Sequence, residues 1–157
     1  MQRVRVFSGG QTGVDRAALD VALELGWECG GWCPAGRAAE DGPIPPRYPL
    51  RETPSADPAE RTAWNVRDSD ATLLLTTGAA SPGTELARHT ARELGRPVYA
   101  WAVTSPADVG SFRRWLQVYR VATLNVAGPR ESESPGVYRA AHSLLRTLLA
   151  GPLPFDP

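Results

Sequence analysis

Strand-like and helix-like segments alternate along the whole chain, and this alternation limits the possible folds more than any other feature. Strands are expected at residues 3–7, 27–33, 71–76, 97–103 and 121–127, and helices at 13–25, 59–68, 82–94, 108–119 and 135–149. The strands after the first are apolar runs, which is typical of strands covered on both faces. The pattern predicts an α/β fold with a mostly parallel five-stranded sheet and helices on both faces.

Punctuating residues support several of these boundaries. Gly26 stands where a left-handed residue would end the first helix, and Ser81 and Pro82 stand where an N-cap and a first helical turn are expected. Residues 35–58 are rich in proline and are expected to form an irregular loop. Because long loops in small domains are usually functional, this loop is a candidate lid over a binding site.

Length and charge restrict the class of protein. A chain of 157 residues is typical of one domain, which we expect at residues 1–150, followed by a frayed tail at 151–157. The 17 basic and 17 acidic residues balance, so neither nucleic acid nor an anionic membrane is an expected partner. The chain has no apolar run long enough to span a membrane, and its start does not resemble a signal peptide, so a cytoplasmic location is predicted.

Lysine and cysteine usage excludes some chemistry. The chain has no lysine, which rules out a Walker A lysine, a Schiff base and a lysine general base. If residues 27–33 form one strand, the Cα atoms of Cys29 and Cys33 lie about 13 Å apart, and the two residues can neither form a disulfide nor share a metal ion. A turn at Gly30 and Gly31 would bring the two thiols together. We interpret both cysteines as small buried hydrophobic residues and predict no metal site.

The loop after the first strand has the composition of a phosphate-binding turn. Its glycines let the backbone approach a ligand closely, and the helix start that follows offers free N–H groups. The candidate contacts here are Ser8, Gly9, Gly10, Gln11, Thr12 and Gly13, with Asp15 and Arg16 in the first helical turn. The dinucleotide motif G-x-G-x-x-G is matched only in part, and no acid follows the second strand, so an NAD dehydrogenase is disfavoured.

Two further strand-to-helix loops have a similar character. One supplies the candidates Ser81, Pro82, Gly83, Thr84 and Glu85, and the other supplies Gly128, Arg130 and Glu131. Because such loops all emerge at the carboxyl edge of a parallel sheet, the three loops are expected to surround one anion-binding crevice. Arg37 and Arg130 are expected to contact the phosphate of a small anionic ligand.

Several motifs stand out along the chain, at residues 8–15 (SGGQTGVD), 34–37 (PAGR), 40–42 (EDG), 65–70 (NVRDSD), 81–84 (SPGT) and 124–132 (LNVAGPRES). Together they resemble a known family, the molybdenum-cofactor carrier proteins of the SLOG superfamily, and the resemblance covers roughly residues 3–149. It implies a Rossmann-like three-layer α/β/α fold and a homo-oligomer, either a dimer or a tetramer. It also implies a protein that holds the molybdenum cofactor, or its pterin phosphate, without transforming it; an adenine nucleotide is the alternative ligand.

Two alternative functions remain open. The phosphoribohydrolase branch of the same superfamily hydrolyses N-glycosidic bonds and carries the motif P-G-G-x-G-T-x-x-E. Here the third residue after Thr84 is Ala87, and the nearest acid, Glu85, is turned by about 200° on a helix. This departure favours a non-catalytic binding protein over a hydrolase that uses Glu85, Glu131 or an aspartate. The other alternative is a sensor of a nucleotide-derived signal that acts with a partner.

Overall fold

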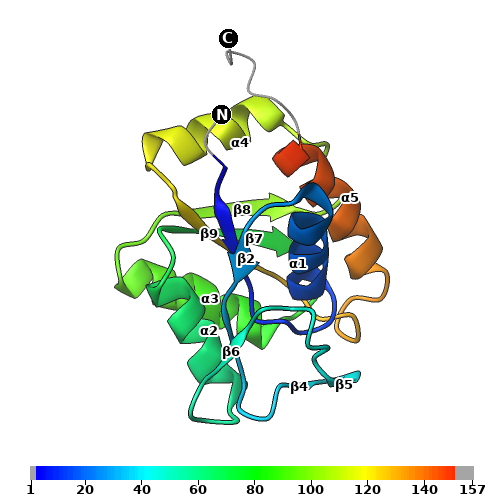
Figure 1. Cartoon of the computed structure of the whole chain (residues 1–157). Coiled ribbons are helices and arrows are strands. Elements are labelled where there is room, and N and C mark those ends of the chain that lie inside the picture. Colours follow the sequence, from blue (N-terminus) through cyan, green and yellow to red (C-terminus); the bar gives the residue numbers. More distant parts are fainter. Residues whose placement is uncertain (1–2, 151–157) are drawn as a thin grey trace.

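A parallel five-stranded sheet forms the centre of the molecule (Figure 1). The computed structural model describes residues 3–150. Across the sheet the strand order is β2 (Cys29–Gly30), β1 (Arg5–Phe7), β9 (Thr123–Ala127), β7 (Ala71–Thr76) and β8 (Val98–Ala102). Every pair of neighbouring strands is parallel, which confirms the predicted α/β fold.

Five helices cover the sheet in two layers, as Figure 1 shows. Helices α1 (Val14–Leu25) and α5 (Val137–Ala150) pack side by side on one face, and α4 (Val109–Val118) lies next to α5. Helices α2 (Pro58–Arg67) and α3 (Pro82–Glu93) pack together on the other face. Because both faces are covered, the middle strands are almost entirely buried, and β7 has five buried residues in succession.

Apolar side chains fill the space on both sides of the sheet. The larger cluster joins the sheet to α1, α4 and α5, through residues such as Val21, Phe112 and Leu145. The smaller cluster joins it to α2 and α3 through Val66, Leu74, Ala87 and Ala91. The α3 members of this cluster, Ala87 and Ala91, are small and fully buried.

Residues 27–33 do not form the single strand that the sequence predicts. The chain turns at Gly31, whose φ of 125° is in a region that favours glycine. A Cβ there would lie 2.4 Å from the backbone oxygen of Ser8. Strand β2 ends before this turn, and β3 (Trp32–Cys33) after it pairs with β6 (Arg51–Glu52) in a separate small sheet. Backbone packing against the first loop therefore divides the predicted strand in two.

The proline-rich loop is more ordered than predicted. It contains an antiparallel hairpin of β4 (Ala38–Ala39) and β5 (Gly42–Pro43), followed by β6. A third apolar cluster anchors it to α1 and consists of Leu19, Cys33, Ile44, Tyr48 and Leu50. Cys33 is buried in this cluster and Cys29 is half-buried in β2; both thiols are free, and burial raises the pKa of each.

The strand order places a crevice at the carboxyl edge of the sheet. After β1 the chain forms β2 at one edge of the sheet. It then crosses to β7 on the other side of β1, and β9 lies between β1 and β7. The loops that leave β1, β9 and β7 therefore start from adjacent strands. Among residues 3–150, no helix is both long and apolar enough to cross a membrane.

Candidate ligand-binding site

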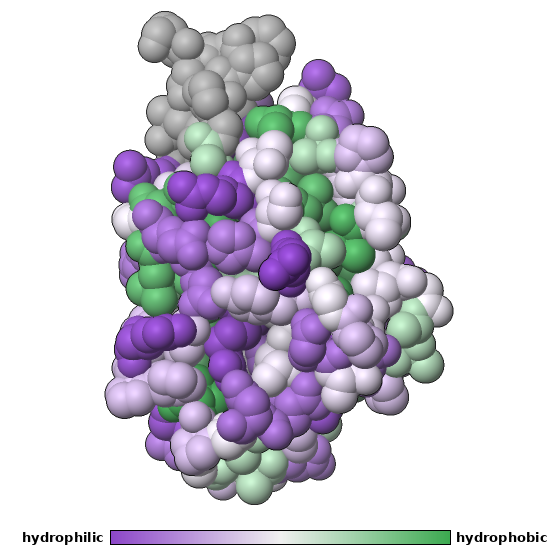
Figure 2. All heavy atoms as spheres, turned by 90° about the vertical axis from the view of Figure 1, so that its right-hand side faces the viewer, coloured by the Kyte–Doolittle hydropathy of each residue, from purple (hydrophilic) through white to green (hydrophobic). Residues whose placement is uncertain are grey.

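A cavity lies at the carboxyl edge, where the loops after β1, β7 and β9 meet α2. In Figure 1 the arrows of β7 and β8 point to the right, so the carboxyl edge of the sheet lies on that side. Figure 2 views the molecule from that side, and hydrophilic side chains gather across the middle and lower part of the face. The cavity is lined by Gly9, Gln11, Asp15, Arg61, Thr62, Asn65, Ser81, Gly83, Thr84, Asn125, Val126, Ala127, Gly128, Arg130 and Glu133. The predicted meeting of three loops at one crevice is therefore observed.

Arg61 on α2 is the most deeply placed cation of this cavity. Its side chain is 12% exposed, and its Nη1 donates to Asp15 Oδ2 at 3.1 Å. Its Nε is buried and has no hydrogen-bond partner among the residues that the structure describes. A Cβ on Gly9 would lie 2.0 Å from Arg61 Nη1, so only glycine lets the guanidinium rest against the first loop. The cavity thus contains a fixed cation with an unsatisfied donor.

Asp15 holds this guanidinium in place from the first turn of α1. Its side chain is 6% exposed, and its Oδ2 also accepts from the amide of Gln11 at 3.3 Å. Burial raises the pKa of Asp15, and the attraction to Arg61 and the bond from Gln11 oppose that shift without cancelling it. Asp15 is therefore a buried partner of Arg61 rather than an exposed anion.

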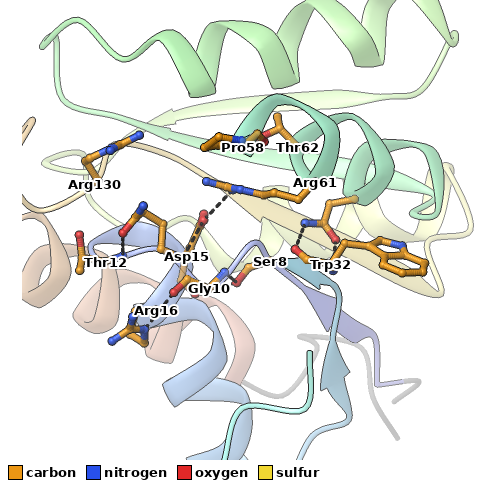
Figure 3. Close-up of polar contacts among 12 residues, drawn as sticks. Ser8, Gly10, Thr12, Asp15, Arg16, Trp32, Pro58, Arg61, Thr62 and Arg130 are labelled. Atoms are coloured by element: carbon orange, nitrogen blue, oxygen red, sulfur yellow. Dashed lines mark hydrogen bonds and ion pairs between the residues drawn. The ribbon is translucent and has the colours of Figure 1, made fainter. Parts of the chain in front are cut away.

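Arg130 approaches the cavity from the loop after β9. Figure 3 shows that the side chains of Arg61 and Arg130 extend toward one another from opposite sides. The side chain of Arg130 is 38% exposed, and its Nε lies 3.8 Å from Glu133 Oε1. Glu133 also accepts from the backbone amide of Arg130 at 3.0 Å. This long ion pair leaves the guanidinium able to contact an anion in the cavity.

The N-terminus of α3 forms a third side of the cavity. Ser81 occupies the predicted N-cap position and Pro82 the first turn, but the Ser81 hydroxyl does not cap the helix backbone. It bonds instead to the Thr84 hydroxyl at 2.7 Å and donates to Glu133 at 3.2 Å. No side chain caps this end of α3, and Gly83 and Thr84 of its first turn line the cavity, so an anion there could accept from the uncapped amides.

The other glycines of the first loop lie outside the cavity wall. A Cβ on Gly10 would meet Leu50 Cδ1 at 2.5 Å and Ile44 Cδ1 at 3.0 Å, so this position faces the apolar cluster of the proline-rich loop. Gly13 precedes α1 and packs against the carbonyl of Pro129. The buried Ser8 hydroxyl donates to the backbone oxygen of Asp15 at 2.8 Å. These three residues shape the loop rather than line the cavity.

Glu40 connects the proline-rich loop to two of the strand-to-helix loops. Its carboxylate accepts from the Thr12 hydroxyl, from the Ser132 amide at 3.1 Å and from the Ser132 hydroxyl at 2.6 Å. Partial removal from water acts to raise the pKa of Glu40, but the bonds from Ser132 and Thr12 outweigh it and hold the pKa below its usual value. Gln11 adds a contact, because its Oε1 accepts from the Glu40 amide at 2.9 Å. These bonds therefore attach the proline-rich loop to the loops after β1 and β9.

The structure gives Arg37 a role different from the predicted phosphate contact. Its guanidinium donates to four backbone oxygens of the proline-rich loop, at distances of 2.8–3.2 Å. The carbonyls belong to Ile44, Pro45, Tyr48 and Leu50. Because proline-rich backbone has few amides with which to satisfy its own carbonyls, the arginine takes the place of those missing donors.

Replacing Arg37 with methionine is expected to lower the free energy of unfolding by about 1.5–3 kcal/mol, since charged hydrogen bonds to the loop are lost. Urea denaturation measures the loss, and limited proteolysis at residues 35–58 should become faster. Arg139→Met, at an exposed arginine of α5, is the matched control. If this variant keeps its stability but no longer binds an anion, Arg37 contacts the phosphate, as the sequence predicts.

Three other predicted contacts point away from the cavity. Arg16 makes a two-pronged bond to Asp41 at 3.0 and 3.2 Å. Glu85 is exposed and lies 3.5 Å from Arg88. Glu131 accepts from the amides of Gly136 and Tyr138 at the start of α5, at 2.6 and 2.9 Å. Each of these charges is occupied by a partner within the protein, and none lines the cavity.

Several lining residues were not among the predicted contacts. Thr62 and Asn65 lie on α2 beside Arg61, and Asn125 lies on β9. Asn65 exchanges two hydrogen bonds with the backbone of Trp32, at 2.8 and 2.9 Å, and thereby ties α2 to the turn after β2. The sequence does predict a helix at 59–68 and does show the family motif at 65–70. Neither feature indicates which face of the helix meets the edge of the sheet, so neither identifies the residues that line the cavity.

The side chains around the cavity were also compared with the needs of a metal ion. No group of three or more histidine, cysteine, aspartate or glutamate side chains within residues 3–150 is arranged to hold a metal ion. The polar groups at the cavity are guanidinium groups, hydroxyls and amide side chains, together with the carboxylates of Asp15 and Glu133, which are paired with Arg61 and with Ser81 and Arg130. This donor set suits phosphate and other oxyanions.

Comparison with known proteins gives two findings. Residues 6–149 match the model of a family described as the circularly permutated YpsA SLOG family. The chain is also similar to a crystal structure from Syntrophus aciditrophicus SB, of a protein named "Putative molybdenum carrier protein". The TM-score is 0.88 at 36% identity, over 94% of this chain and 96% of that one. No curated protein sequence matches the chain.

Proposed function

The chain belongs to the circularly permutated YpsA SLOG family, and from this membership we propose that it binds a small phosphorylated anion without transforming it. The proposed site is the cavity between Arg61, Arg130 and the N-terminus of α3. We propose the molybdenum cofactor as its cargo, with an adenine nucleotide as the alternative. The name of the similar crystal structure, a molybdenum carrier protein, supports this choice of cargo.

The convergence of Arg61 and Arg130 is the observation that carries the proposal (Figure 3). Arg61 has a buried Nε with no partner among the described residues, and Arg130 has only a long contact to Glu133. A phosphate between them would receive two charge-assisted contacts and further bonds from the amides of α3.

The fit to the molybdenum cofactor concerns its phosphate rather than the metal. A terminal phosphate matches the guanidinium groups of Arg61 and Arg130 and the N-terminus of α3. The molybdenum would arrive as part of the cargo. The residues of the chain then bind and orient the phosphorylated end and limit its contact with water.

Binding is favoured over N-glycosidic hydrolysis by the positions of the acids. Glu85, the nearest match to the hydrolase glutamate, is exposed and outside the cavity. Asp15 is buried beneath Arg61, and Glu133 is engaged by Ser81 and the amide of Arg130. A homo-oligomer and a cytoplasmic location remain part of the proposal.

Native mass spectrometry with molybdenum analysis tests the cargo. Protein purified from cells that make the molybdenum cofactor is expected to carry a pterin and molybdenum in a fixed ratio to the chain. Protein from cells blocked in cofactor synthesis is the control and is expected to lack both. If an adenine nucleotide co-purifies instead, the nucleotide and not the molybdenum cofactor is the cargo. Release of free base from nucleoside monophosphates would contradict a non-catalytic role.

A further inference from the structure

Strand β8 leaves one edge of the sheet open. It is the last strand in the sheet order and pairs with β7 alone. The amide of Thr72 donates to Pro97 at 3.0 Å, and the amide of Val103 donates to Thr76 at 2.8 Å. Because alternate residues of a parallel strand face the same neighbour, residues 97, 99, 101 and 103 face β7. The amides and carbonyls of Val98, Ala100 and Ala102 therefore face outward.

Three arginines line a groove beside this open edge. The groove is formed by Arg88, Arg92 and Arg96 together with Val98 and Ala100. Arg88 contacts the exposed Glu85 at 3.5 Å, and Arg96 donates to the backbone oxygen of Arg67 at 3.2 Å. Arg92 is exposed and makes no hydrogen bond or ion pair with any residue that the structure describes. Among residues 3–150, no acidic side chain lines the groove.

The spacing of the arginines matches the spacing of a strand. Arg88 and Arg92 are four residues apart on α3, which separates them by about 6 Å along the helix axis. Alternate residues of an extended strand are separated by about 6.6 Å. A strand added beside β8 would thus bring a side chain at every second position toward one arginine. The helix and the strand edge together form a two-part recognition surface.

We propose that this edge binds an extended acidic segment of a partner protein, which adds a strand to β8 and pairs its carboxylates with Arg88, Arg92 and Arg96. Backbone bonds to residues 98, 100 and 102 would provide the pairing, and the arginines would select acidic side chains. A second copy of this chain is a poorer occupant, because it would bring a second set of arginines toward the first. The surface is separate from the proposed phosphate cavity.

A labelled peptide of alternating glutamate and valine tests the charge recognition. Fluorescence anisotropy at low salt is expected to show binding to the wild-type protein and weaker binding at high salt. Arg92→Glu is expected to weaken binding about tenfold or more, whereas Arg139→Glu, the matched charge reversal on α5, is expected to leave it unchanged. Equal effects of the two variants, or equal binding of a lysine–valine peptide, would overturn the proposal.

The variant Ala100→Pro tests the strand addition. Because the Ala100 amide faces outward, proline there removes a donor from the open edge while the bonds to β7 remain. Circular dichroism checks the fold of the variant, and peptide binding is expected to be lost. If the variant does not fold, a peptide with N-methylated backbone amides tests the same pairing on the wild-type protein. Retained binding would overturn strand addition. Dissociation of an oligomer by Ala100→Pro, or displacement of the peptide by single-stranded DNA, would assign the edge to another partner.

Discussion

Replacing Arg61 with methionine is expected to lower the free energy of unfolding by about 3–5 kcal/mol at neutral pH, because it leaves the buried carboxylate of Asp15 without its partner. It is also expected to abolish anion binding, since Arg61 is the deepest cation of the cavity. Urea denaturation measures the first effect and calorimetric titration the second. Arg139→Met is the matched control and should change neither.

The pH dependence of this variant follows from the pKa of Asp15. Burial raises the pKa of Asp15 in the folded protein above its value in the unfolded chain. The part of the folding stability that depends on this group is therefore fully present below the unfolded pKa, and it is lost as the pH rises through the folded pKa. Arg61 opposes the shift, and its removal raises the folded pKa further. The difference from wild type should therefore be larger at neutral pH than in mild acid.

The double variant Asp15→Asn with Arg61→Met separates the charge from the packing. Its stability is expected to exceed that of Arg61→Met alone, because the uncompensated carboxylate is gone. Anion binding should remain absent, because the guanidinium is still missing. If the double variant is no more stable than Arg61→Met, the ion pair is not the source of the loss.

Replacing Arg130 with alanine is expected to weaken anion binding by about 1.5–3 kcal/mol, or roughly 10- to 150-fold in Kd, through loss of one charge-assisted contact. The titrant is the pterin or adenine nucleotide that co-purifies with the protein. Stability should change little, because Arg130 is 38% exposed and its ion pair with Glu133 is long. Arg130 is therefore the cleaner test of binding.

Glu85→Gln is the control for the Arg130 variant. Its side chain is exposed and paired with Arg88 outside the cavity, so anion affinity should be unchanged. An effect of Arg130→Ala within error would remove this arginine from the site. A large effect of Glu85→Gln on nucleotide turnover would favour the hydrolase alternative.

The secondary structure was largely predictable, because local patterns determine it. The apolar run at 71–76 coincides with β7, and the helix expected at 13–25 begins one residue later and ends at Leu25. Gly26 ends α1 in the left-handed conformation, as predicted. The failure at 27–33 has a non-local cause, since Gly31 turns where its backbone meets that of Ser8.

The roles of the arginines were much less predictable. Arg37 and Arg16 were expected to contact the ligand, and both are occupied by the proline-rich loop. Arg61 was not expected there, and it is the deepest cation of the cavity. Arg130 was expected at the crevice and lies there. A guanidinium bonds to whatever acceptors the fold brings within reach, and its position in the sequence does not identify them.

By itself, the sequence determined the alternation of strands and helices, the parallel sheet and the meeting of glycine-rich loops at its carboxyl edge. These features depend on residue periodicity and on backbone preferences within a few neighbouring residues. The tertiary structure alone decided that β9 lies between β1 and β7 and that α2 turns Arg61 into the cavity. Those two outcomes depend on contacts between segments far apart in the chain, and such contacts form only when the whole core packs.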